Sequence, residues 1–138
     1  MPAGINHPLI GYVSFCAIKF AGYSIAGRML SKSYQCADRS ALLVGGVRTL
    51  IGMAAGASYF FAWQWLPVPL HPGLFIWLAG LAPIRILEWW LLLWLFYDRP
   101  LKHFAKDWRC AAFGAVWSYV LDLPALVGFI ATGGLWVC

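Results

Sequence analysis

Charged residues are scarce in this chain of 138 residues. Only 11% of the residues are Asp, Glu, Lys or Arg, whereas a soluble domain usually carries about 25%. Hydrophobic residues make up 62% of the chain and aromatic residues 17%. This composition excludes a disordered chain, and it excludes a globular domain that is soluble in water. It predicts an integral membrane protein.

The sequence also lacks the usual motifs of metal, redox and nucleotide sites. Its three histidines form no His-x-x-x-His or Glu-x-x-His pair, and its four cysteines form no Cys-x-x-Cys pair. We therefore expect no bound metal and no cofactor. A Walker or Rossmann glycine loop is absent as well. The basic residues flank apolar stretches, which argues against nucleic acid as a partner. No catalytic residue can be identified from the sequence.

Four long apolar stretches are present, at about 9–30, 41–66, 73–97 and 111–136. Each is long enough to cross about 30 Å of hydrocarbon at about 1.5 Å per residue. Backbone polar groups must be bonded within a membrane-spanning segment, so helices are expected. The sequence predicts one all-α transmembrane domain over residues 1–138, built as a bundle of four membrane-spanning helices.

Lysine and arginine are distributed unevenly among the connections. Loops 31–40 and 98–110, with Arg28 just before the first, hold seven of the ten basic residues. The N-terminal tail, the turn near His71 and the C-terminal end hold none. Because basic loops stay in the cytoplasm, we expect both loops inside and both termini outside. We expect the protein to lie in a bacterial inner (plasma) membrane.

Residues 99–109 have an amphipathic pattern. Leu101, Phe104 and Trp108 recur at helical spacing, and charged residues including Asp107 take the other faces. This pattern predicts a short helix on the inner membrane surface that contacts anionic lipid headgroups. A basic loop that only sets the topology is the alternative. The expected membrane-surface residues are Lys102, Lys106, Trp108 and Arg109.

Five charged side chains lie inside the apolar stretches, namely Lys19, Arg48, Arg85, Glu88 and Asp122. A charge at the centre of a span costs about 2.5–3.5 kcal/mol on insertion scales, so these residues are expected to face the bundle interior or a wet cavity. Arg48 lies on the same helix face as a stripe of small residues that includes Gly45 and Gly52. Small residues mark close helix contacts, which places Arg48 between helices.

The spacing of these charges predicts specific pairs. Arg85 and Glu88 are three residues apart and can pair on one helix face. Asp122 is expected to pair with Lys19 or with Arg48, which leaves one of the three cations without a carboxylate. A buried cation that has no carboxylate partner favours the binding of an anionic ligand. We therefore interpret all five residues as candidate ligand-binding residues.

These observations predict a small polytopic membrane protein whose charged cluster binds or moves an anionic or amphipathic small molecule or lipid. One alternative is a non-catalytic accessory or assembly subunit, in which the charges form a structural network. A second is a phospholipid-modifying enzyme that holds phosphate with Arg48 and Arg85, although no nucleophile or metal set supports it. Four helices bury few side chains, so we expect a homo-oligomer or a membrane-protein partner in addition to anionic membrane lipids.

Overall fold

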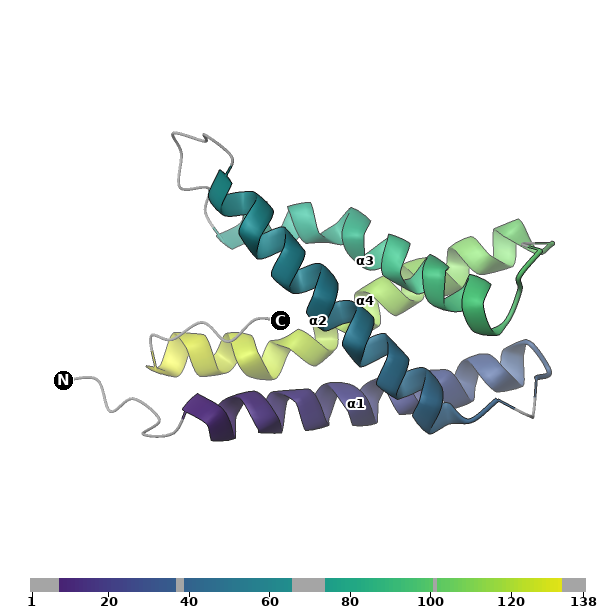
Figure 1. Cartoon of the computed structure of the whole chain (residues 1–138), viewed down its shortest axis with the longest axis horizontal. Helices are drawn as coiled ribbons and strands as arrows, with labels where there is room; N and C mark the ends of the chain where they lie inside the picture. Colours follow the sequence, from purple (N-terminus) through teal and green to yellow (C-terminus); the bar gives the residue numbers. More distant parts are fainter. Residues whose placement is uncertain (1–7, 37–38, 66–73, 101, 133–138) are drawn as a thin grey trace.

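The computed structural model describes residues 8–36, 39–65, 74–100 and 102–132, and these residues are helical apart from short connections. The helices are α1 (Pro8–Ser33), α2 (Ala41–Trp65), α3 (Leu74–Phe96) and α4 (Phe104–Thr132), drawn in Figure 1. All four predicted apolar stretches are therefore helical over most of their length. The predicted segment ends at 66, 73 and 133–136 lie outside the described residues.

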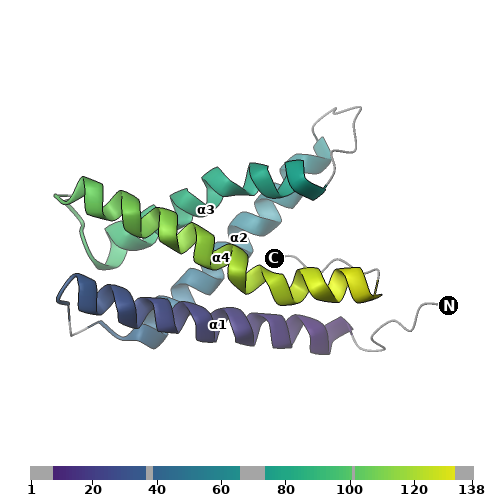
Figure 2. The ribbon, with the colours of Figure 1, turned by 180° about the vertical axis from the view of Figure 1, so that it is seen from behind.

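The four helices pack so that each lies against the next one along the chain, and α4 also lies against α1. The connections after α1 and after α3 are at the same end of the bundle, on the right in Figure 1 and on the left in Figure 2. The basic residues of loops 31–40 and 98–110 belong to these connections and to the adjoining helix ends. The structure thus gathers them at one end of the molecule.

The predicted separate interfacial helix at 99–109 is wrong. Helix α4 begins at Phe104 and continues through Arg109 without interruption, because neither glycine nor proline breaks this stretch. The preceding turn is held by Asp98, whose carboxylate accepts a hydrogen bond from the backbone N–H of His103 at 3.0 Å. Pro124 lies inside α4, and the helix changes direction part-way along its length (Figure 2).

Within the described residues, two helices are long and apolar enough to cross a membrane, α2 within Ala41–Tyr59 and α3 within Ala79–Phe96. Large apolar side chains are also exposed on the outer faces of all four helices. Examples are Met29, Leu50, Leu87 and Phe113, which are between 65% and 77% exposed. Such a surface is typical of a protein that contacts lipid. Both observations fit a helical membrane protein, but among the described residues they do not extend to four membrane-spanning helices.

The apolar core lies between the charged cluster and the end of the bundle that carries the basic loops. Tyr23, Val44, Trp89, Leu92 and Leu93 are each no more than 1% exposed. They come from α1, α2 and α3, so their packing fixes the relative positions of these helices. The charged side chains lie directly beside this packed layer.

Candidate functional site

The structure brings the five predicted charged residues together. Lys19 comes from α1, Arg48 from α2, Arg85 and Glu88 from α3, and Asp122 from α4. All five are between 0% and 9% exposed. The prediction that they face the bundle interior is confirmed. Four helices are needed to assemble this cluster, so it depends on the packing of the whole bundle.

The five charges form one continuous chain of alternating sign. A Glu88 carboxylate oxygen accepts from Arg48 at 2.5 Å and lies 3.4 Å from Arg85. Arg85 continues the chain to Asp122 at 3.1 Å, and the other carboxylate oxygen of Asp122 lies 2.6 Å from the Lys19 ammonium. Arg85 therefore joins the two carboxylates, and each carboxylate serves two cations.

Two predicted pairs, Arg85–Glu88 and Lys19–Asp122, are present. The expectation that one cation lacks a carboxylate is wrong, because Arg48 pairs with Glu88 across the α2–α3 contact. Sequence spacing favoured Glu88 as a partner of Arg85 alone. It gave no sign that a residue on another helix reaches the same carboxylate oxygen.

Arg48 is enclosed by aromatic rings as well as by its carboxylate partner. Its guanidinium carbon lies 4.8 Å from the centroid of the Tyr23 ring and 5.0 Å from that of Trp89. The Ser118 hydroxyl accepts from Arg48 at 3.2 Å and from the Trp89 indole at 2.9 Å, and it donates to the Gly114 carbonyl at 3.0 Å. Cation–π contacts of this kind are worth about 2 kcal/mol or more when desolvated. Arg48 is thus held from three directions.

Sequence reasoning did not assign Trp89 to the site. Its position was a usable signal, since Trp89 follows Glu88 directly and lies one helical turn after Arg85. A tryptophan deep in a span also departs from the usual interfacial placement of this residue. Tyr23 and Ser118 lie on the faces that the sequence pattern gave to Lys19 and Asp122. Their role around Arg48 follows only from how the helices cross.

Part of the Arg48 side chain has no partner. Its Nε and Nη1 atoms are buried, and no hydrogen-bond acceptor contacts them among the described residues. Gly52, one turn further along α2, lies beside the Nη1 atom. A Cβ built on Gly52 would lie 3.1 Å from Arg48 Nη1 and 3.6 Å from Arg85 Nη1, with no third contact within 4 Å among the described residues. Two guanidinium groups therefore lie within 4 Å of one point next to a glycine.

The loop end of the bundle has a second buried polar contact, at Asp107. Its carboxylate accepts a hydrogen bond from the Tyr34 hydroxyl at 2.5 Å, and Asp107 is 0% exposed. Burial and this hydrogen bond raise the pKa of Tyr34 above its ordinary value. The prediction that Asp107 lies on an outer polar face is therefore wrong. Helix α1 covers that face of α4, so Asp107 points into the α1–α4 contact.

Asp98 is held ionised by its surroundings in the turn before α4. Burial by itself raises the pKa of a carboxyl group, but hydrogen bonds from the backbone N–H groups of His103 and Lys102 outweigh it. They lower the pKa of Asp98 below its ordinary value. The Asp98 carboxylate thus stabilises the turn that sets the direction in which α4 begins.

The four predicted membrane-surface residues lie in different environments. Lys102, Trp108 and Arg109 are exposed, as expected for residues that face headgroups or lipid. Lys106 is half-buried, donates to the Ser33 carbonyl at 2.6 Å, and lies 4.1 Å from the centroid of the Tyr34 ring. Lys106 therefore also ties α4 to the end of α1.

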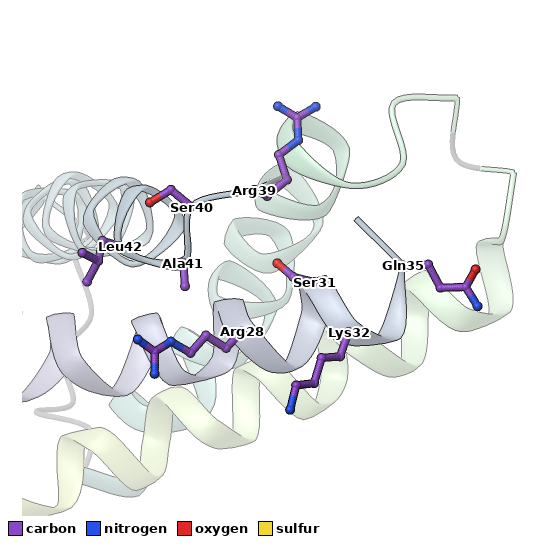
Figure 3. A pocket seen from close by; sticks show the side chains of 8 residues that line it. All are labelled: Arg28, Ser31, Lys32, Gln35, Arg39, Ser40, Ala41 and Leu42. Carbon is purple, nitrogen blue, oxygen red and sulfur yellow. The ribbon is translucent and has the colours of Figure 1, made fainter. Parts of the chain in front are cut away.

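Two hollows open on the surface near the loop end. One, of about 460 Å³, runs between α1 and α4 and has an apolar lining apart from Ser33, Lys106 and Arg109 at one end. The other, of about 620 Å³, lies between the end of α1 and the start of α2. Its basic residues Arg28, Lys32 and Arg39 extend in different directions (Figure 3). They form a basic rim and do not converge on a single binding point.

Among the described residues, no three His, Cys, Asp or Glu side chains gather in a way that would hold a metal ion. Comparison of the chain with protein family models, with curated proteins and with solved structures finds no match.

Proposed function

We propose that this protein is a four-span membrane protein whose buried charge cluster binds the anionic group of a small molecule or lipid. The observation that carries the proposal is the state of Arg48, which is 0% exposed and has two N–H-bearing atoms without an acceptor among the described residues. The candidate binding residues are Lys19, Arg48, Arg85, Glu88 and Asp122.

Two features of the chain support four spanning helices. The helices contain 26, 25, 23 and 29 residues, and at about 1.5 Å per residue even the shortest exceeds the roughly 30 Å of hydrocarbon. The basic loops 31–40 and 98–110 belong to one end of the bundle. On the basis of the positive-inside rule, we propose that these loops face the cytoplasm and that both termini lie outside.

The topology is tested with single-cysteine variants that retain either Cys36 or Cys138. We expect a membrane-impermeant thiol reagent to label Cys138 in sealed cells and to label Cys36 only after the membrane is opened. Cys36 belongs to loop 31–40, and Cys138 is the last residue of the chain. Labelling of Cys36 in sealed cells would reverse the proposed orientation.

The energetic argument for an anionic ligand starts from the unsatisfied donors. A buried N–H without an acceptor costs about 1–3 kcal/mol, and more when the group is charged. Three cations and two carboxylates leave the cluster with one net positive charge. An oxyanion beside Gly52 would accept from Arg48 Nη1 and also approach Arg85 Nη1. It would satisfy buried donors and neutralise the excess charge at the same time.

Gly52→Ala tests this placement because its methyl group would occupy the space assigned to the ligand oxygen. The probe is octyl phosphate, compared with the uncharged amphiphile octyl glucoside, and binding is read from the thermal unfolding of the purified protein. We expect octyl phosphate to stabilise the wild type. We expect Gly52→Ala to weaken its binding by about tenfold or more, the equivalent of about 1.4 kcal/mol.

Gly46→Ala is the matched control. It makes the same substitution in the same helix, but its Cβ would meet only the Phe20 ring at 3.7 Å, an ordinary contact. This variant should bind octyl phosphate like the wild type. Equal binding by Gly52→Ala and Gly46→Ala would show that the anion does not lie beside Arg48.

The two alternative functions lead to other observations. An accessory subunit would be recovered in a stable complex with unrelated subunits when native mass spectrometry follows gentle extraction. A homo-oligomer that retains a small anion would favour the binding function. A phospholipid-modifying enzyme needs an activated nucleophile, and the Ser118 hydroxyl already donates to the Gly114 carbonyl. That geometry offers the enzyme hypothesis no support.

A further inference from the structure

The groove between α1 and α4 changes character along its length. Helix α4 contributes Lys106 and Arg109 near its start, followed by Phe113 and Trp117 on the same side. From Lys106 to Trp117 the helix rises about 16 Å at about 1.5 Å per residue. The groove is therefore cationic at the loop end and apolar further into the bundle. A molecule that fits both parts has an anionic head and a hydrocarbon tail.

The indole N–H groups of the two tryptophans that line the groove already have hydrogen-bond acceptors. The Trp117 indole N–H donates to the Gly22 carbonyl at 3.1 Å, and the Trp89 indole N–H donates to Ser118. Trp89 reaches the groove beside Gly114, where a Cβ would collide with its ring. The indole surfaces that face the groove are therefore apolar. A hydrocarbon chain can cover them without leaving a polar group unpaired.

The positive charges at the cationic end of the groove are available to a ligand. No carboxylate of the described residues lies within 4.0 Å of the charged nitrogens of Lys106 or Arg109, and Arg109 is exposed. Phe113, one turn beyond Arg109, is 77% exposed, so the groove opens toward the surface that lipid would cover. Charge and apolarity thus complement a phospholipid in the inner leaflet.

We propose that this groove holds one anionic phospholipid, with its phosphate at Lys106 and Arg109 and an acyl chain against Met29, Phe113 and Trp117. The site is separate from the space beside Gly52 and does not depend on the function proposed for the charge cluster. The two sites share one residue, because Trp89 lines the groove and also covers Arg48.

Native mass spectrometry of the purified protein tests this proposal. The protein is mixed with equal amounts of phosphatidylglycerol and phosphatidylcholine that carry the same acyl chains. We expect the wild type to retain one phosphatidylglycerol with a preference of about tenfold, since two charge-assisted contacts distinguish the headgroups. We expect Lys106→Gln/Arg109→Gln to lose this preference. Arg109→Gln alone should lose part of it, and this variant leaves the Lys106–Ser33 contact intact.

Arg39→Gln/Arg99→Gln is the control, because it removes the same charge from exposed residues outside the groove. This variant should keep the preference for phosphatidylglycerol. An equal loss in both double variants would overturn the proposal and indicate general attraction to a basic surface. Displacement of the lipid by inorganic phosphate alone would overturn it as well, because the acyl groove would then contribute nothing.

The same experiment separates this site from the charge cluster. Gly52→Ala should retain the phospholipid, whatever its effect on octyl phosphate at Arg48. Loss of the phospholipid in Gly52→Ala would contradict the separation of the two sites.

Discussion

Arg48→Met is expected to lower the free energy of unfolding by about 3–5 kcal/mol, the cost of breaking a buried ion pair by removing one partner. Glu88 would lose its 2.5 Å partner and keep, among the described residues, the longer contact with Arg85 at 3.4 Å. Tyr23 and Trp89 would lose the cation between their rings. Methionine is apolar and similar in length, so the change removes charge and hydrogen bonds more than volume.

A double-mutant cycle with Glu88→Gln isolates the pair itself. Glu88→Gln alone leaves Arg48 buried without its carboxylate and should also destabilise the fold strongly. When both changes are combined, neither charge is left without the other. The double variant should therefore lose less free energy of unfolding than the sum of the two single variants.

The measurement is reversible unfolding in mixed micelles, followed by helix content. Lys102→Gln is the control, since Lys102 is exposed and surface substitutions usually stay within about 0.5 kcal/mol. Additive losses in the cycle would show that Arg48 and Glu88 do not stabilise one another. The charge chain would then not be the element that fixes how α2 and α3 pack.

Gly45→Ala is expected to lower the free energy of unfolding of the bundle by about 1–3 kcal/mol, because the added methyl group overpacks the contact between α1 and α2. A Cβ on Gly45 would lie 2.9 Å from the backbone nitrogen of Ser24 and 3.0 Å from its Cα, in addition to overlapping the Ser24 hydroxyl. A backbone cannot rotate away as a side chain can. The α1–α2 contact would have to open, and Arg48 and Lys19 would move apart with their helices.

Gly46→Ala is again the matched control, this time at the neighbouring residue. Its Cβ would make one ordinary contact with Phe20, and alanine favours a helix over glycine by up to about 1 kcal/mol. Gly46→Ala should therefore unfold at the same or a higher temperature than the wild type. If Gly45→Ala were as stable as Gly46→Ala, the close approach of α1 and α2 at Ser24 would be incorrect.

Trp89 gives the two proposed sites a physical connection. Its ring lies over Arg48 at 5.0 Å, its N–H holds Ser118 at 2.9 Å, and it lines the α1–α4 groove. A lipid that packs against Trp89 would therefore touch the residue that positions Arg48.

Composition and residue spacing were sufficient to predict the helices and the identity of the buried charges. Apolar runs of more than 20 residues leave a chain few choices other than helix, and charges within such runs are too costly to face lipid. These are local properties, readable from composition and spacing. The Arg85–Glu88 pair belongs with them, because three residues in a helix place two side chains on one face.

The packing of the helices determines which of them meet and therefore which partner each charge takes. Arg48 could not be assigned to Glu88 from spacing, since 40 residues separate them and the contact exists only where α2 crosses α3. The cage of Tyr23, Trp89 and Ser118 has the same origin. The continuity of α4 and the burial of Asp107 were likewise missed, because the face that α1 covers is set by packing. A sequence pattern indicates whether a residue is suited to a buried or an exposed position. The packing of the helices determines which residues it contacts.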